Sequence, residues 1–148
     1  VGKYLGKKEI NKATQSIYEG LRGALIFMSS MGIIFIFFPN YILPLFTSDP
    51  EVIATGINIL RFLGFLQFID AIAITLWFAL SGAGDTKFTA LMGIIASWVI
   101  FVPLSYFLGI ILEFGIWGPW LAFSAYLIFE VIVIIFRFKQ GKWKHIKV

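Results

Sequence analysis

Four long apolar stretches decide what this chain can fold into. They cover about residues 21–43, 52–80, 88–112 and 114–136. A helix needs roughly 20 residues to cross a hydrocarbon core about 30 Å thick, so each stretch is long enough to span a bilayer. Lipid leaves exposed backbone groups without partners, so spanning segments must be helices or a closed barrel. Barrel strands are short and alternate in polarity, unlike these continuous stretches. We therefore expect an all-α polytopic membrane protein with four transmembrane helices.

Composition excludes most other classes of protein. The chain is 59% hydrophobic and 14% charged, and a soluble domain of 148 residues would not bury so much apolar surface. It has no cysteine, and its one histidine, His145, has no second ligand at a suitable spacing, so we expect no resident metal. The glycines of residues 82–84 form a turn and lack the signature of a phosphate-binding loop. We expect neither an enzyme nor a bound cofactor.

The connections and charges predict how the helices are arranged. Residues 47–51, 81–87 and 113–115 are short links, so neighbouring helices must run antiparallel. Apart from Arg61, every basic residue lies before or at the very start of the first stretch, where Arg22 stands, in the second link or after the fourth stretch. With antiparallel helices, these basic segments all lie on one side of the membrane. The charged residues of the first and third links, which lie on the other side, are all acidic, namely Asp49, Glu51 and Glu113. This positive-inside pattern places both termini in the cytoplasm. We expect the membrane to be the cytoplasmic (inner) membrane. The same pattern accounts for the net positive charge of the chain, so we expect no nucleic-acid partner.

The two ends of the chain are polar. Residues 1–20 are expected to be a cytoplasmic connector with an amphipathic helix, and residues 137–148 a basic cytoplasmic tail. The tail combines lysines with Trp143, which suits an anionic lipid surface. Because the chain begins with Val1 rather than Met and the connector is not a natural beginning, we expect it to be part of a longer protein.

Five short motifs occur in order along the chain. They are VGKYLG at residues 1–6, LSGAGDT at 80–86, PLSY at 103–106, GIWGPW at 115–120 and RFKQGKW at 137–143. In this order and spacing the chain resembles the multidrug and toxic compound extrusion (MATE) family. The resemblance implies the last four of twelve helices, forming part of the C-terminal bundle of a transporter. It further implies export of small organic cations in exchange for H⁺ or Na⁺. The expected partners are then the lipid bilayer, the organic cations and the remaining N-terminal helices of the full-length chain.

Asp70 is the leading candidate for a functional residue. It lies 18 residues after Val52 and 10 before Leu80, where a carboxylate is costly unless it is protonated, paired or bound to an ion. Gln67, three residues earlier, shares its face and is a second candidate for cation or substrate binding. The segment around them resembles the cation-binding tenth helix of NorM-like MATE members, although Leu66 stands where that pattern has a tyrosine. Asp70 would be neutral when protonated and anionic when it holds Na⁺ or a cationic substrate. The alternative is a structural carboxylate bonded to a neighbouring helix.

Two further charges lie inside the apolar stretches. Arg61 is nine residues before Asp70 and therefore on the opposite helix face, where it is expected to reach the interface or another helix. Glu130, two turns before Arg137, is expected to be an interfacial carboxylate near Arg137 or the basic tail, with a second protonatable site as the alternative. Members of the family often carry a basic residue near this position. Both residues are secondary candidates.

Two other functions remain open at the level of sequence. A lipid-linked oligosaccharide flippase of the same superfamily would need more intramembrane Arg and Lys than Arg61 alone. The chain could also be a free-standing four-helix protein, such as a small dimeric transporter or an assembly subunit. Such a protein would have no hydrophobic spans upstream of Val1, whereas the antiporter and the flippase would have eight. We expect the antiporter.

Overall fold

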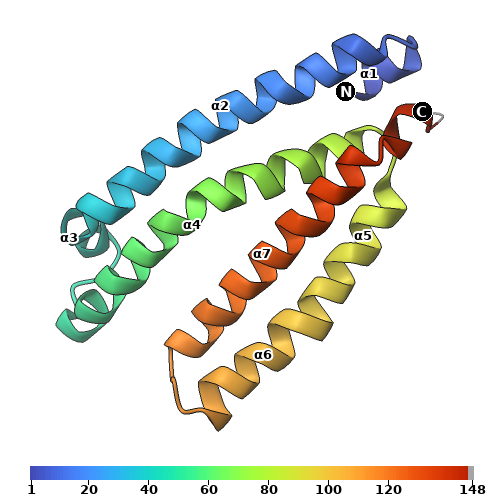
Figure 1. Cartoon of the computed structure of the whole chain (residues 1–148). Coiled ribbons are helices and arrows are strands. Elements are labelled where there is room, and N and C mark those ends of the chain that lie inside the picture. The colour runs from blue at the N-terminus through green and yellow to red at the C-terminus, as the bar shows by residue number, and fades with distance from the viewer. Residues whose placement is uncertain (147–148) are drawn as a thin grey trace.

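The computed structural model describes residues 1–146, and these residues form helices and no strands (Figure 1). In chain order the helices are α1 (Gly2–Gly6), α2 (Ile10–Phe37), α3 (Pro39–Ile42), η1 (Leu43–Leu45), α4 (Pro50–Gly82), α5 (Thr86–Ile95), η2 (Ala96–Phe101), α6 (Val102–Tyr106), η3 (Phe107–Ile111), α7 (Trp117–Lys139) and η4 (Lys142–His145). Four helices are long and apolar enough to cross a membrane: α2, α4, the continuous run from α5 to η3, and α7. The all-α, four-span fold class is confirmed.

The first spanning helix begins well before the apolar stretch. Residues 10–20, assigned to the connector from sequence, are continuous with the first span in α2, so no helix boundary falls at residue 21. The helix ends at Phe37 because a proline at residue 39 lacks an N–H and restricts the residue before it. The chain then restarts as α3 with Pro39 in its first turn.

Asp49 sets the start of α4. Its carboxylate accepts hydrogen bonds from the backbone N–H groups of Glu51 (2.9 Å) and Val52 (3.5 Å), which satisfies two donors that the helix leaves free. Pro50 occupies the first turn, where its missing N–H costs nothing, and the Glu51 charge favours the positive end of the helix dipole. The helix therefore starts two residues earlier than the apolar pattern predicts.

The third span contains two π-helical segments, η2 and η3, on either side of Pro103. A proline inside a spanning helix leaves a carbonyl without its usual partner, and wider helical turns are one way in which membrane helices adjust to this. Ser97 lies in the first of these segments, η2.

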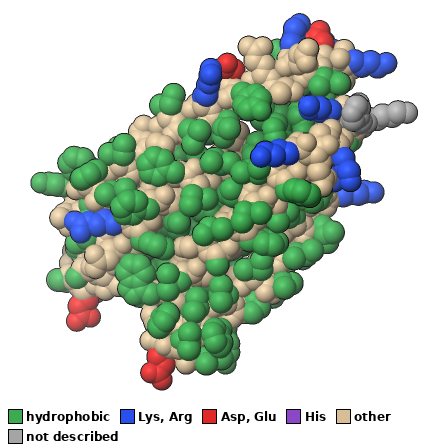
Figure 2. All heavy atoms as spheres, viewed as in Figure 1, with side chains coloured by type: hydrophobic (Ala, Val, Ile, Leu, Met, Phe, Trp, Pro, Cys, Tyr) green, Lys and Arg blue, Asp and Glu red, His purple; other side chains and the backbone are tan. Residues whose placement is uncertain are grey.

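The main buried cluster lies at the end of the molecule that holds both termini (Figure 1). Its buried residues are Leu5, Ala13, Ile17, Leu76, Ala79, Leu80, Ala83, Ile134 and Trp143. The connector, the ends of α4 and α7 and the tail therefore share one core. Elsewhere large apolar side chains cover the outer surface, as lipid-facing helices require (Figure 2).

Trp143 corrects the sequence interpretation of the tail. It is 1% exposed rather than placed at a lipid surface. Its ring stacks on Phe138 with centroids 5.3 Å apart, and its Nε1 donates a hydrogen bond to the Phe138 carbonyl at 3.1 Å. Gly141, at φ 70°, turns the chain back so that this contact forms. The end of the tail, residues 147–148, and the side chain of His145 lie outside the described residues.

Candidate functional site

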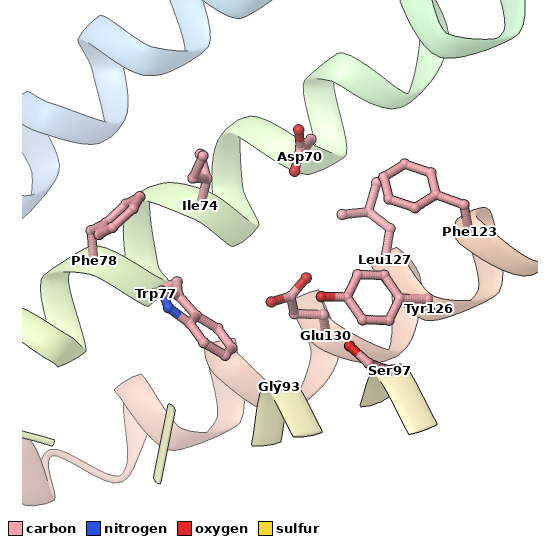
Figure 3. A pocket seen from close by; sticks show the side chains of 10 residues that line it. All are labelled: Asp70, Ile74, Trp77, Phe78, Gly93, Ser97, Phe123, Tyr126, Leu127 and Glu130. Atoms are coloured by element: carbon pink, nitrogen blue, oxygen red, sulfur yellow. The ribbon is translucent and has the colours of Figure 1, made fainter. Parts of the chain in front are cut away.

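An open pocket of about 390 Å³ lies between α4, the start of the third span and α7 (Figure 3). Its lining residues are Asp70, Ile74, Trp77 and Phe78 from α4, Gly93 and Ser97 from the third span, and Phe123, Tyr126, Leu127 and Glu130 from α7. A volume of this size falls within the range of small-molecule sites. The pocket therefore joins the leading candidate, Asp70, to residues far away in the sequence.

Helical spacing explains how each element presents its side chains to the pocket. The four residues of α4 follow the spacing i, i+4, i+7, i+8, and those of α7 follow i, i+3, i+4, i+7, so each set forms one stripe. A cluster of Leu66, Ala73 and Leu127 holds α4 against α7 beside the pocket. Gly93 makes room for Trp77, because a Cβ at residue 93 would lie 2.9 Å from the indole ring.

The pocket brings Asp70 and Glu130 together from two helices. Asp70 is half-buried, whereas Glu130 is only 9% exposed. Figure 3 shows the Tyr126 hydroxyl, one turn earlier on α7, directed toward the Glu130 carboxylate. Among the described residues neither carboxylate forms an ion pair. The site therefore presents two acidic groups to whatever occupies the pocket.

Gln67 and Arg61 lie away from this pocket. Gln67 packs toward α2, where a Cβ built on Gly32 would lie 3.2 Å from the Gln67 Cβ. Three residues turn a helix by about 300°, which leaves the two side chains about 60° apart. Gln67 therefore meets α2, while Asp70, on the adjoining part of the same helix surface, lines the pocket beside α7. Arg61 is exposed and makes no ion pair with any described residue.

The sequence interpretation has Glu130 near Arg137 or the basic tail, but Arg137 does not pair with it. Arg137 instead binds Asp85, with Nε–Oδ2 at 2.7 Å and Nη2–Oδ1 at 3.1 Å. Its guanidinium also lies over the Phe88 ring, 4.6 Å from the centroid. Arg137 is thereby held at the end of α7, and Glu130, two turns deeper, faces the pocket. Sequence reasoning missed the Asp85–Arg137 pair, although both residues belong to motifs it had singled out.

Sequence reasoning also missed the aromatic part of the site. Phe123 and Tyr126 stack with centroids 5.9 Å apart, and Phe101 meets Tyr126 edge to face at 6.1 Å. Trp77 faces them from α4 (Figure 3). The chain has 17 phenylalanines, most of which are expected to face lipid or the core. No feature of the sequence distinguishes the aromatic residues of the pocket from these others.

Carboxylates, hydroxyls and ring faces together are suited to binding cations. Carboxylate and hydroxyl oxygens are ligands for a hard ion such as Na⁺, and aromatic faces attract organic cations. No group of three or more metal-ligating side chains occurs within the part of the chain that the structure describes.

Comparison with known proteins assigns the chain to a family. The MatE family model matches residues 1–107. The chain is 30% identical over 144 residues to a probable multidrug resistance protein NorM of Thermotoga maritima, covering 97% of this chain and 31% of the relative. It is 32% identical over 145 residues to a probable multidrug resistance protein NorM of Bacillus cereus, covering 98% and 32%. An uncharacterized transporter, YisQ of Bacillus subtilis, is 29% identical over 143 residues, covering 97% and 31%.

This four-span membrane protein belongs to the MATE family. The chain spans about a third of the length of the curated relatives it matches. No solved structure matches it at a significant level. The family resemblance seen in the sequence motifs is confirmed.

Proposed function

We propose that this chain is part of a cation-coupled antiporter that exports organic cations across the cytoplasmic membrane, with Asp70 as a coupling carboxylate. The observation that carries the proposal is the position of Asp70 in an aromatic pocket between spanning helices. Family membership and the printed names of the relatives, which describe multidrug resistance proteins, support the same function. The protein is on this view a transporter rather than an enzyme.

The proposed mechanism requires only competition for one site. A proton or Na⁺ neutralises Asp70 when the coupling ion is bound, and an organic cation neutralises it when substrate is bound. An empty, ionised Asp70 in apolar surroundings is unfavourable, so one occupant is exchanged for the other. Two bundles that rock about a central cavity would carry each occupant across. This chain would form part of the C-terminal bundle, and the remaining helices of the full-length protein would supply the rest of it and the other bundle.

Charge supports the proposed orientation. Figure 2 shows most of the lysine and arginine side chains gathered at the end that holds both termini, with acidic side chains both there and at the opposite end. The acidic residues at that opposite end are Asp49, Glu51 and Glu113. By the positive-inside rule, the end with the termini faces the cytoplasm.

The flippase alternative receives no support from the pocket. A pyrophosphate-linked lipid head carries negative charge and would need basic partners. The pocket presents two carboxylates and no basic residue among its described lining. Arg61, the basic residue within the second span, is exposed and lies outside the pocket.

The test is gradient-driven efflux of a fluorescent organic cation from vesicles that carry the full-length protein. Asp70→Asn removes the exchangeable charge with little change in shape and should abolish efflux at normal membrane expression. Asp49→Asn is the matched control, because asparagine also caps a helix start well and Asp49 lies outside the pocket. Undiminished efflux by the Asp70→Asn protein would remove Asp70 from the mechanism.

A further inference from the structure

We infer that the pocket is a two-carboxylate site that favours organic dications, with Glu130 as the residue that determines this preference. The inference rests on the proposed function and assigns a substrate class to the same pocket. Asp70 supplies one negative charge from α4, and Glu130 supplies the second from α7. A single compound with two positive charges neutralises both.

Glu130 is placed as a ligand-binding group rather than as a structural one. It is more than nine-tenths buried, faces the pocket and forms no ion pair with a described residue. A carboxylate has about four lone-pair positions, and the Tyr126 hydroxyl that points toward it can satisfy only one of them. The remaining positions face the open pocket, where a cation would find them as partners.

The nearest basic residue along α7 is not available to Glu130. The Arg137 guanidinium uses both Nε and Nη2 on Asp85, which lies 52 residues away in sequence. It is held further by the Phe88 ring. The charge of Glu130 is therefore left for an occupant of the pocket, and Arg137 does not compensate it from the same helix.

The walls of the pocket select for flat aromatic cations. Phe123 and Tyr126 lie nearly parallel, with 20° between their planes, and Trp77 stands across the pocket from them. Ring faces attract cationic aromatic compounds and also bury their apolar surface. A monocation bound here neutralises one carboxylate and leaves the other to keep a proton. When a dication binds, both carboxyl groups can lose their protons, and each carboxylate then pairs with one of the two positive charges.

Ethidium and propidium test this directly, because they share one ring system and propidium carries an additional quaternary ammonium group. Uptake of each dye into proteoliposomes that contain full-length protein is followed with DNA enclosed in the lumen as the reporter. Glu130→Gln should lower kcat/KM for propidium at least about tenfold, equivalent to about 1.4 kcal/mol. For ethidium the loss should stay below about threefold, since Asp70 still pairs with its single charge.

Three further proteins complete the comparison. Glu130→Asp keeps the charge and should keep the preference for propidium, whereas Glu113→Gln removes an exposed carboxylate outside the pocket and should change neither dye. Asp70→Asn should lose both dyes. Anisotropy of each dye with purified full-length protein measures binding without transport and should show the same selectivity.

The outcomes separate this inference from the proposed function. Equal losses for the two dyes in Glu130→Gln, or no loss for either, overturn the dication site while leaving Asp70 and antiport intact. A Glu130→Asp protein as impaired as Glu130→Gln also counts against charge as the determinant. If wild type moves and binds neither dye, or Asp70→Asn handles both normally, the proposed function fails and this inference fails with it.

Discussion

Arg137 and Asp85 form a two-point salt bridge that fastens the turn after α4 to the end of α7. The pair joins Nε to Oδ2 at 2.7 Å and Nη2 to Oδ1 at 3.1 Å. Both side chains are well shielded, with 20% of Arg137 and 8% of Asp85 exposed. The bridge therefore fixes the helices that form the pocket at the end where the termini lie.

Breaking this bridge should lower stability clearly. Arg137→Gln leaves Asp85 buried without its partner, and we expect a loss of about 3–5 kcal/mol in the free energy of unfolding. Arg22→Gln is the control, because the Arg22–Glu19 pair is exposed and is worth at most about 1 kcal/mol. Unfolding of the full-length proteins in detergent measures both. Equal stability of the two variants would show that the bridge is not structural.

Close contact between α2 and α4 depends on two glycines. A Cβ at Gly64 would lie 2.7 Å from the Gly32 carbonyl oxygen, and one at Gly32 would lie 2.6 Å from the Gly64 oxygen. Gly64→Ala should therefore force the helices apart and destabilise the protein by about 1–3 kcal/mol. Gly23→Ala meets no atom within 4 Å and should stabilise α2 slightly, as alanine favours helix. Thermal unfolding of the two variants should move in opposite directions, and a shared direction would contradict the packing described.

The buried tail tryptophan is expected to contribute to stability rather than to membrane attachment. Trp143→Ala removes a buried ring that stacks on Phe138 and should cost about 3–5 kcal/mol. Trp143→Phe keeps the stacking and loses the hydrogen bond to the Phe138 carbonyl, at about 0.5–1.5 kcal/mol. Denaturant unfolding distinguishes them. A Trp143→Ala protein with native stability but weaker binding to anionic vesicles would restore the lipid-surface interpretation.

Ser97 offers a way to detect occupancy of the pocket. The chain has no cysteine, so a thiol introduced at residue 97 reacts without a background from these helices. Ser97→Cys should react with a cationic thiol reagent, and ethidium should slow that reaction because the residue lines the pocket. Ser105→Cys is the control, since the Ser105 hydroxyl is buried, and it should react poorly with or without dye. Equal labelling of Ser97→Cys in the presence of dye would place the substrate elsewhere.

The sequence was sufficient for the spans and for the position of Asp70 within one of them. Length and continuity of apolar residues define a spanning helix, and short links define antiparallel neighbours. The rotation of each helix was not predictable in the same way. α4 is apolar on nearly all sides, so its residue pattern does not show which face meets α7 and which meets α2. Gln67 and Asp70 consequently looked like one site, although they face different neighbours.

Long-range pairing of side chains was equally beyond the sequence pattern. Asp85 and Arg137 are 52 residues apart, and only the folded arrangement brings them together. Once Arg137 is assigned to Asp85, Glu130 loses its expected partner and becomes part of the pocket. The burial of Trp143 was not predictable for the same reason. It depends on the turn at Gly141 and on the contact with Phe138, not on the basic residues beside it.

The most direct test of the central claim is the flux of the coupling ion driven by substrate. Proteoliposomes with full-length protein receive a gradient of ethidium and no ion gradient, and the movement of H⁺ and of Na⁺ is recorded in separate experiments. We expect ethidium movement to drive one of these ions in the opposite direction in wild type, and we expect Asp70→Asn to abolish this exchange. Ethidium movement without any counter-ion in wild type, or full exchange in Asp70→Asn, would contradict it.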